Sequence, residues 1–292
     1  MARIIMIRFQ EGRAEPDRLI YSRHDPAIRR LRSLQSREGR DHTGQFLIEG
    51  IRPLAQAVRQ GDRVETLVVA PQLLTNTLGH RLVKQLRLAG TPCYRLTPEV
   101  YHSLSQAEEP QGVAAVMKQR WENLDQVRPS RGLCWIAVEA VQSAGNLGTI
   151  LRTSEAVGGS GVILIGETVD PHDPTTVRAS MGALFNQKFV RATAAAFAAW
   201  KKRHQCLLVG TSPSAATDYK AVAYPSSLIL LMGGEKKGVS PEVQALCDTM
   251  VKIPMVGRGD SLNLAIAAGI LLYEVFDQRR NHGASVPLGS SC

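Results

Sequence analysis

The sequence has few cysteines, and they are scattered along the chain with no CxxC pair: Cys93, Cys134, Cys206, Cys247 and Cys292. Neither a disulfide framework nor a zinc site is indicated, and the histidines show no metal-ligand spacing. No apolar run approaches the ~20 residues of a membrane span. The first nine residues lack the long apolar core and the small-residue cleavage site of a secretory signal. These absences favour a reduced, cytoplasmic setting and no bound metal.

The motifs of common nucleotide-binding enzymes are also missing. No G-x-G-x-x-G follows the first strand expected in the second half of the chain. Residues 233–238 have the length of a P-loop, but Val239 follows them where the phosphate-binding lysine would stand. Ser212 and Ser214 lack the flanking glycines of a hydrolase nucleophile elbow. A standard dinucleotide-binding fold, a P-loop NTPase and a serine hydrolase are therefore not supported.

Acidic residues are too few to balance the basic ones, and the net charge is +9 with a pI near 9.6. No lysine occurs before Lys84, and arginine supplies the early positive charge. Seven arginines fall within residues 18–40, against Asp25 and Glu38: Arg18, Arg23, Arg29, Arg30, Arg32, Arg37 and Arg40. Arginine binds phosphate bidentately and stacks on bases, which suits structured RNA. A charge run alone is more often a solvated face; the motifs below favour RNA, contacted by Arg29, Arg30, Arg32, Arg37 and Arg40.

Hydrophobic periodicity predicts two α/β units. In the first, helices are expected over 25–35, 53–59 and 78–88, and strands over 46–50, 66–70, 93–96 and 112–117. A polar stretch with Pro129 follows. In the second unit, strands are expected over 133–138, 162–165, 206–209, 228–231 and 250–253, and helices over 147–157, 175–184, 194–203, 241–246 and 262–279. Apolar strands separated by helices predict a parallel sheet that is covered on both faces.

Three segments of the second unit carry polar residues where a strand passes into a loop or a helix. The first, residues 145–153, reads GNLGTILRT; the second, 231–240, reads LMGGEKKGVS; the third, 253–263, reads IPMVGRGDSLN. In open α/β sheets this edge binds ligands. Asn146 and Ser261 can cap the helices that follow them, and two adjacent glycines permit close approach of the backbone to a ligand.

In this order and spacing the segments resemble the three motifs of the SpoU (TrmH-type) RNA ribose methyltransferases. The resemblance covers residues 133–280, and residues 22–118 resemble the substrate-binding domain that often precedes the SpoU domain. It implies an RNA-binding domain at 22–118 and a methyltransferase domain at 133–280. The polar stretch between them predicts a linker at 119–132, the lack of periodicity at the start predicts a flexible extension (1–21), and the small polar residues at the end predict a disordered tail (281–292). The resemblance also implies a trefoil knot in the parallel-sheet domain, which periodicity alone could not predict.

The resemblance further implies S-adenosylmethionine as cofactor, RNA as substrate and a homodimer formed through the C-terminal domain. Cofactor contacts fall at Gly233, Ile253, Met255, Gly257 and Leu262. Active-site positions fall at Asn146, Arg152, Glu235, Ser261 and Asn263. Arg152 would hold the phosphate on the 3′ side of the target and stabilise negative charge on the ribose 2′-oxygen. Because arginine is a poor proton acceptor, the proton goes to the phosphate, to water or to a transiently neutral arginine, and the sequence does not distinguish these.

Two positions depart from the family pattern, and two other functions remain open. Ser143-Ala144 stand where the family has Asp-Pro, and Gly234 stands where a polar residue usually precedes the glutamate. Neither change removes Arg152 or Asn263. The expected function is methylation of a ribose 2′-hydroxyl of 23S ribosomal RNA. The alternatives are a transfer RNA 2′-O-methyltransferase and a non-catalytic RNA-binding assembly factor.

Overall fold

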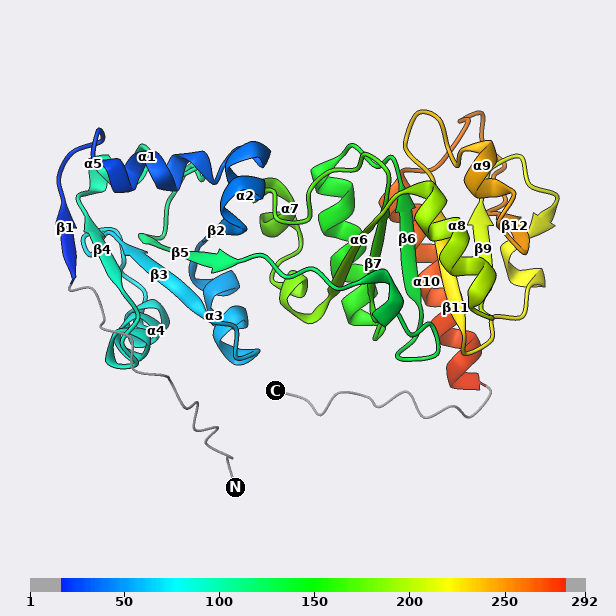
Figure 1. Ribbon diagram of the computed structural model, residues 1–292, viewed down its shortest axis with the longest axis horizontal. Helices are drawn as coiled ribbons and strands as arrows, with labels where there is room; N and C mark the ends of the chain where they lie inside the picture. The colour runs from blue at the N-terminus through cyan, green and yellow to red at the C-terminus, as the bar shows by residue number, and fades with distance from the viewer. Residues whose placement is uncertain (1–16, 282–292) are drawn as a thin grey trace, which may run out of the picture. The chain divides into compact units, whose positions relative to one another are not determined.

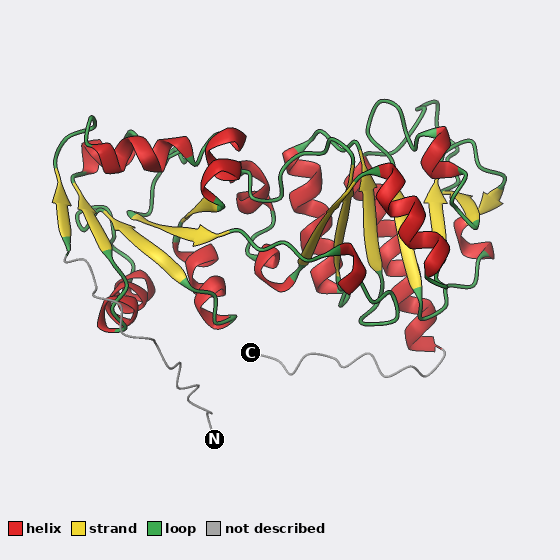
Figure 2. Cartoon of the chain, in the orientation of Figure 1, coloured by secondary structure: helices red, strands yellow, loops and turns green. Residues whose placement is uncertain are grey.

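A computed structural model describes residues 17–281, which divide into two compact units between Gln119 and Arg120 (Figure 1). Residues 1–16 of the expected extension and 282–292 of the expected tail lie outside the described residues. Both units contain helices and strands in alternation, as predicted (Figure 2). Within 17–281, no helix is long and apolar enough to span a membrane.

The first unit is built on a mixed five-stranded sheet in the order β1-β4-β3-β5-β2. β1, β4 and β3 run parallel, whereas β5 is antiparallel to both of its neighbours. The strands are β1 (Arg18–Ile20), β2 (Gln45–Glu49), β3 (Val64–Val69), β4 (Cys93–Leu96) and β5 (Val113–Lys118). The helices are α1 (Pro26–Ser33), α2 (Arg37–Thr43), α3 (Ile51–Arg59), α4 (Thr77–Leu88) and α5 (Pro98–His102).

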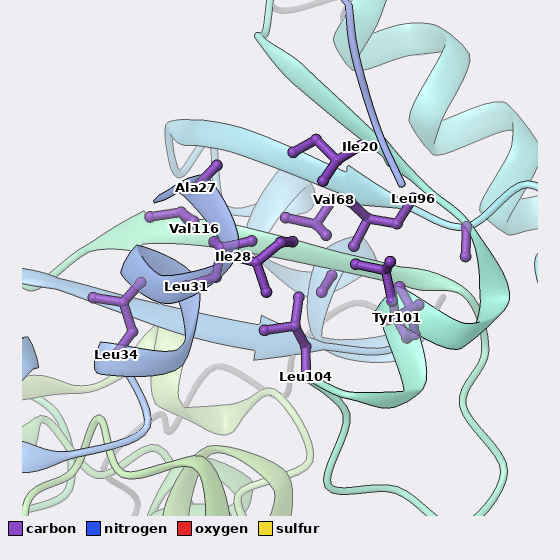
Figure 3. Packing of buried hydrophobic residues seen from close by; sticks show 13 residues of the cluster. Ile20, Ala27, Ile28, Leu31, Leu34, Val68, Leu96, Tyr101, Leu104 and Val116 are labelled. Carbon is purple, nitrogen blue, oxygen red and sulfur yellow. The ribbon is translucent and has the colours of Figure 1, made fainter. Parts of the chain in front are cut away.

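Helices cover both faces of this sheet. α1 buries Ile28 and Leu31 in a cluster with Val68 of β3 and Val116 of β5 (Figure 3). Because side chains alternate along a strand, the neighbours of Val68 face the opposite side, where α3 and α4 pack against each other and α3 contacts β5. The two helical layers therefore lie on opposite faces of one sheet (Figure 1).

The second unit carries a seven-stranded sheet in the order β10-β12-β9-β11-β6-β7-β8, and every pair is parallel. The strands are β6 (Trp135–Glu139), β7 (Gly161–Ile165), β8 (Lys188–Ala192), β9 (Leu207–Thr211), β10 (Thr217–Asp218), β11 (Leu228–Met232) and β12 (Thr249–Lys252). The helices are α6 (Ala144–Ala156), α7 (Pro174–Ala179), α8 (Ala194–Arg203), α9 (Pro241–Gln244) and α10 (Leu264–Asn281), with short 3₁₀ turns η1 (Leu124–Gln126), η2 (Ala183–Asn186) and η3 (Tyr219–Ala221).

Both faces of the second sheet are covered, as the uninterrupted burial of β6, β7 and β11 requires. Phe197 and Trp200 of α8 join one core cluster with Trp135 and Ile229. α10 packs on α6 and β11. The helix expected over 175–184 ends earlier, at Ala179. Met181 and Gly182 have φ of 54° and 94°, and this left-handed backbone cannot continue a right-handed helix.

The domain boundaries differ from those expected at two places. Arg18–Ile20, placed in the flexible extension, form β1 and pair with β4, so the first unit begins before residue 22. Most of the expected linker 119–132 packs on the second unit: the backbone N–H of Glu122 donates to Phe189 O, and Val127 is buried in the α8 cluster. The linker is therefore shorter than expected, because apolar residues such as Val127 within the polar stretch pack on the second unit.

Candidate active site

A cavity of about 590 Å³ opens at the carboxyl edge of the second sheet. It lies beside the ends of β9, β11 and β12 and the start of α10. The predicted site residues that line it are Asn146, Gly233, Glu235, Ile253, Met255, Ser261, Leu262 and Asn263. The structure therefore brings the three sequence motifs to one place, at the edge where parallel sheets bind ligands.

Glu235 joins the second motif to the first. Its carboxylate accepts hydrogen bonds from Asn146 Nδ2 (3.0 Å) and from the backbone N–H groups of Gln142 (3.1 Å) and Ser143 (3.2 Å). Partial burial alone would raise the pKa of Glu235, but the hydrogen bonds from Asn146 and from backbone N–H groups lower it. The carboxylate is therefore ionised at neutral pH and fixes the loop ahead of α6.

Asn146 also joins the first motif to the third. Asn263 Nδ2 donates to Asn146 Oδ1 at 3.0 Å. The same Asn263 caps α10, because its Oδ1 accepts from Ala265 N (2.9 Å) and Ile266 N (3.3 Å). A chain of hydrogen bonds thus runs from Glu235 through Asn146 to Asn263 and holds the three motifs in one arrangement.

Both helix caps expected from the sequence are wrong. Ser143 caps α6 by accepting from Asn146 N at 3.2 Å, so the Asn146 side chain is available for Glu235 and Asn263. Asn263, and not Ser261, caps α10. Ser143 stands where the family has aspartate, and both residues cap helices well, so the substitution keeps a capping side chain at this position.

The glycines of the second motif shape a tight loop. Gly234 and Gly238 exchange two backbone hydrogen bonds of 3.1 and 2.9 Å, which leaves Glu235, Lys236 and Lys237 at the tip. A Cβ on Gly233 would lie 2.1 Å from Gly238 C, inside the same loop. One on Gly234 would lie 2.6 Å from Ala140 O. Both positions therefore require glycine for the packing of the loop itself. One of them is Gly234, where the SpoU pattern usually has a polar residue.

A second carboxylate anchors this loop on the sheet. Glu139, at the end of β6, is buried and accepts from Ser240 Oγ (2.6 Å) and Ser240 N (2.8 Å). Ala140 follows with φ of 54°, a left-handed conformation that is uncommon for residues other than glycine. The turn after β6 and the loop of the second motif are thus locked to each other.

Arg152 and Gly257 lie outside the lining of this cavity. Arg152 is exposed on α6, six residues beyond Asn146, which is about 9 Å along the helix axis. Its guanidinium has no ion pair or hydrogen bond among the described residues. Gly257 is exposed in the loop between β12 and α10. Arg152 is therefore free to contact a substrate that extends along α6.

The structure adds residues that the sequence reasoning missed. Lys236 and Lys237 line the cavity from the loop tip, and neither ammonium group has a partner within 17–281. Thr211, Ser212 and Pro213 line it from the end of β9. The position of residues 211–213 after an apolar strand was the signal that could have identified them.

The arginines of residues 18–40 do not form one surface. Arg40 is 1% exposed and donates to the carbonyl oxygens of Leu34 and Gln35, so its predicted contact with RNA is wrong. Arg32 is half-buried and bonds Ser103. Arg30 donates to Gln45. Arg29 is exposed, with no side-chain partner among the described residues, and Arg37 pairs with Asp41 at 3.5 Å.

Residues 134–273 match the SpoU rRNA methylase family, and residues 25–115 match the MRM3-like substrate binding domain. The chain is 32% identical over 272 residues to the 23S rRNA (uridine(2479)-2′-O)-methyltransferase of Streptomyces viridochromogenes, covering 87% of this chain and 94% of that relative. This chain belongs to the SpoU rRNA methylase family. It is 28% identical over 256 residues to the 23S rRNA (guanosine(2553)-2′-O)-methyltransferase RlmP of Bacillus subtilis, covering 88% and 98%.

Solved structures of other SpoU proteins have the same fold. The AdoMet-bound rRNA methyltransferase from Sinorhizobium meliloti superimposes with a TM-score of 0.81 at 33% identity, covering 90% of this chain and 98% of that one. The SpoU methyltransferase AviRb from S. viridochromogenes, in complex with AdoMet, gives a TM-score of 0.81 at 30% identity, covering 88% and 99%. The similarity spans both units, and it confirms the predicted family and fold class.

Proposed function

We propose that this SpoU protein transfers a methyl group from S-adenosylmethionine to a ribose 2′-hydroxyl of structured RNA, with 23S ribosomal RNA as its substrate. The observation that carries the proposal is the hydrogen-bonded chain Glu235–Asn146–Asn263 at the rim of the cavity. It joins all three motifs of the family at one edge of the sheet. The RNA is inferred from the two relatives whose names specify 23S rRNA.

The cavity fits the cofactor in size and chemistry. Its 590 Å³ lies within the ~300–1,000 Å³ of small-molecule sites. Met232, Ile253 and Leu271 supply apolar surface for rings, while the backbone at Gly233 and Leu262 offers polar groups. S-adenosylmethionine supplies a methyl group on a positively charged sulfur. We assign its binding to Gly233, Ile253, Met255 and Leu262, with Gly257 in the adjoining loop.

The remaining site residues act on the RNA. Arg152 holds the phosphate on the 3′ side of the target and stabilises negative charge on the 2′-oxygen, as a donor outside the cofactor cavity. Asn146 and Glu235 hold the start of α6 and thereby set the position of Arg152. Ser261 and Asn263 present polar groups at the cavity rim, where they orient the ribose.

Lys236 and Lys237 complete the binding of the substrate. Both lie at the tip of the hydrogen-bonded Gly234–Gly238 loop, and Glu235 beside them already accepts hydrogen bonds from N–H donors. Two unpaired cations attract RNA phosphates and disfavour a positively charged sulfur nearby. Replacing both by glutamine should raise KM for RNA severalfold and should not weaken the binding of S-adenosylmethionine, because the change removes two like charges from the cavity that holds the sulfonium. A loss of cofactor affinity with unchanged KM for RNA would reverse the assignment.

A homodimer, a trefoil knot and a cytoplasmic location belong to the same proposal. Ile266 and Tyr273 of α10 are 55% and 50% exposed, and their spacing of seven places them on one helix face. Exposed apolar side chains grouped on one face mark an interaction surface, and a second copy would cover this one. Light scattering of Tyr273→Glu should show a smaller particle than the parent. An unchanged mass would exclude this face from the interface.

The test of the function is methyl transfer to defined RNAs. The purified chain should incorporate labelled methyl groups from S-adenosylmethionine into deproteinised 23S rRNA. The phosphodiester on the 3′ side of the product nucleotide should resist alkaline hydrolysis, because its methylated 2′-oxygen can no longer attack the phosphorus. Transfer only to transfer RNA would favour the transfer RNA enzyme. RNA binding with no transfer to either RNA would favour the non-catalytic assembly factor.

A further inference from the structure

The first unit has a cavity on the sheet face opposite α1. It lies between α4 and the strands β3 and β4 and has a volume of about 210 Å³. Buried Val69, Leu74 and Cys93 form its floor, and Pro71 and Val83 form its apolar walls. Figure 1 shows α4 on the side of the sheet away from α1. The cavity is therefore separate from the surface of α1, where Arg29 and Arg30 lie.

The rim of this cavity is basic. His80 and Arg87 of α4 and Arg95 of β4 surround it. Arg95 and His80 are exposed, and neither side chain has a partner among residues 17–281. Arg87 is paired with the carboxylate of Asp17, which neutralises the charge of Arg87 at the rim. Burial raises the pKa of the Cys93 thiol to about 11, so the floor carries no negative charge at neutral pH.

An apolar floor with the unpaired guanidinium of Arg95 and the imidazole of His80 at the rim suits a ligand that has a flat ring and an anionic chain. The volume is below the ~300 Å³ at which ordinary small-molecule sites begin, so a whole nucleotide cofactor does not fit and a single ring does. RNA recognition commonly places unstacked bases against apolar or guanidinium surfaces while arginines hold the backbone.

We infer that this cavity receives one unstacked base of the substrate RNA, with the flanking phosphates on Arg95 and His80. The inference rests on the proposed function, because it takes the first unit to be the part that binds RNA. It assigns a base-binding site to α4, β3 and β4, away from the arginines of α1. The site would fix the register of the RNA on the first unit.

Two variants of the full chain test separately the binding of the base in the cavity and the binding of the phosphates at the rim. Val83→Phe fills the cavity without changing its charge, and Arg95→Ala removes one cation from the rim. Arg63→Ala is the matched control, since Arg63 is an exposed arginine of the same unit, outside the cavity. Affinity for deproteinised 23S rRNA is measured for each at several salt concentrations, beside the affinity for S-adenosylmethionine and the melting temperature.

Arg95→Ala should bind the RNA about threefold to tenfold more weakly and reduce the slope of log affinity against log salt by about one. Val83→Phe should weaken binding with the slope unchanged, because a base contact releases no counterion. Arg63→Ala should match the parent. If Val83→Phe melts early, photocrosslinking of 4-thiouridine RNA to the parent replaces it, and crosslinks within 69–95 are expected.

Parental affinity in both cavity variants, or crosslinks confined to other segments, would overturn the inference. Methyl transfer by the parent to the same 23S rRNA is measured first. If the parent transfers methyl groups and the variants bind as it does, only the base site fails. If the parent transfers none to any RNA, the proposed function fails, and the binding data still report on the cavity.

Discussion

Asn146 joins the three loops of the site through a single side-chain amide. Its Nδ2 donates to Glu235, and its Oδ1 accepts from Asn263. An aspartate here would lose the donor and face a carboxylate, and a leucine would remove both hydrogen bonds and with them the side-chain link between the second and third motifs. An amide suits this position because its one planar group carries both the donor for Glu235 and the acceptor for Asn263.

Arg152 tests the assignment of the transition-state donor. Arg152→Ala should lower kcat by about 100-fold, the scale of removing one fixed donor, while the affinity for S-adenosylmethionine stays unchanged because Arg152 lies outside the cavity. Arg152→Lys should recover only part of the rate, since an ammonium group cannot form the bidentate contact. Arg203→Ala, an exposed arginine of α8 paired with Asp125, is the control. Near-normal turnover of Arg152→Ala would refute the role.

Glu235 gives the site a dependence on acidic pH. Because its pKa is lower in the folded protein than the usual 4.5, the carboxylate contributes stability above that value. The contribution is lost as the pH falls through the folded pKa. The difference in unfolding free energy between the parent and Glu235→Gln should therefore be constant from pH 7 to 5 and shrink below about pH 4.5. Denaturant titrations giving a difference that does not change with pH would contradict this.

Two glycines of α6 differ in what they permit. A Cβ on Gly148 would lie 2.5 Å from Ala179 Cβ and 2.8 Å from Thr176 O of α7, whereas one on Gly145 would lie 3.9 Å from its nearest neighbour. Gly148→Ala should destabilise the protein by about 1–3 kcal/mol, the usual cost of overpacking. Gly145→Ala should be neutral or stabilising, because alanine is the better helix former. Equal melting temperatures for the two variants would contradict this, and would mean that α7 can move away from α6 at little cost in stability.

The sequence predicted the elements whose pattern is local. The strands 228–231 and 93–96 and the helix 194–203 appear at or within one residue of the expected positions, since apolar runs and breakers define them. It missed β8, an edge strand with polar Lys188 and Arg191 that depends on pairing with β7. It also missed β1, which is a strand only because β4 lies beside it.

The candidate site was predictable in its residues but not in their contacts. The motifs identified Asn146, Glu235 and Asn263, yet which side chain caps a helix depends on distances that no spacing gives. Gly233 shows the same limit. From the sequence alone, replacing Gly233 by valine is expected to block cofactor binding. In the structure the added Cβ would instead collide with Gly238 of the same loop. That variant would deform the loop before it filled the cavity.

At the scale of the whole molecule, the positive charge divides into groups with different roles. Arg40 and Arg32 stabilise the first unit through carbonyl and hydroxyl acceptors. Trp121 and Arg191 form a cation–π contact in the second unit, with the guanidinium carbon 3.8 Å from the ring centre. Arginines held by such contacts are less available to RNA, so a net charge of +9 overstates the number of phosphates that the chain can neutralise.

The face of α1 carries the last prediction. Arg29 is exposed without a partner, and Arg30 is exposed with one bond to Gln45. Phosphate contacts by both would be independent of base sequence. Arg29→Ala/Arg30→Ala should therefore weaken binding to 23S rRNA and to unrelated structured RNA alike, and lower the salt slope by about two.

Arg32→Ala is the contrasting variant, because it breaks the contact with Ser103. It should lower the melting temperature and leave the salt slope close to that of the parent. Filter binding across salt concentrations separates the two effects, since loss of fold reduces the active fraction without changing the slope. A double variant with the parental slope would make α1 a solvated face. The phosphates would then have to lie on Arg95 and His80 of the opposite face of the first unit and on Lys236 and Lys237 of the Gly234–Gly238 loop.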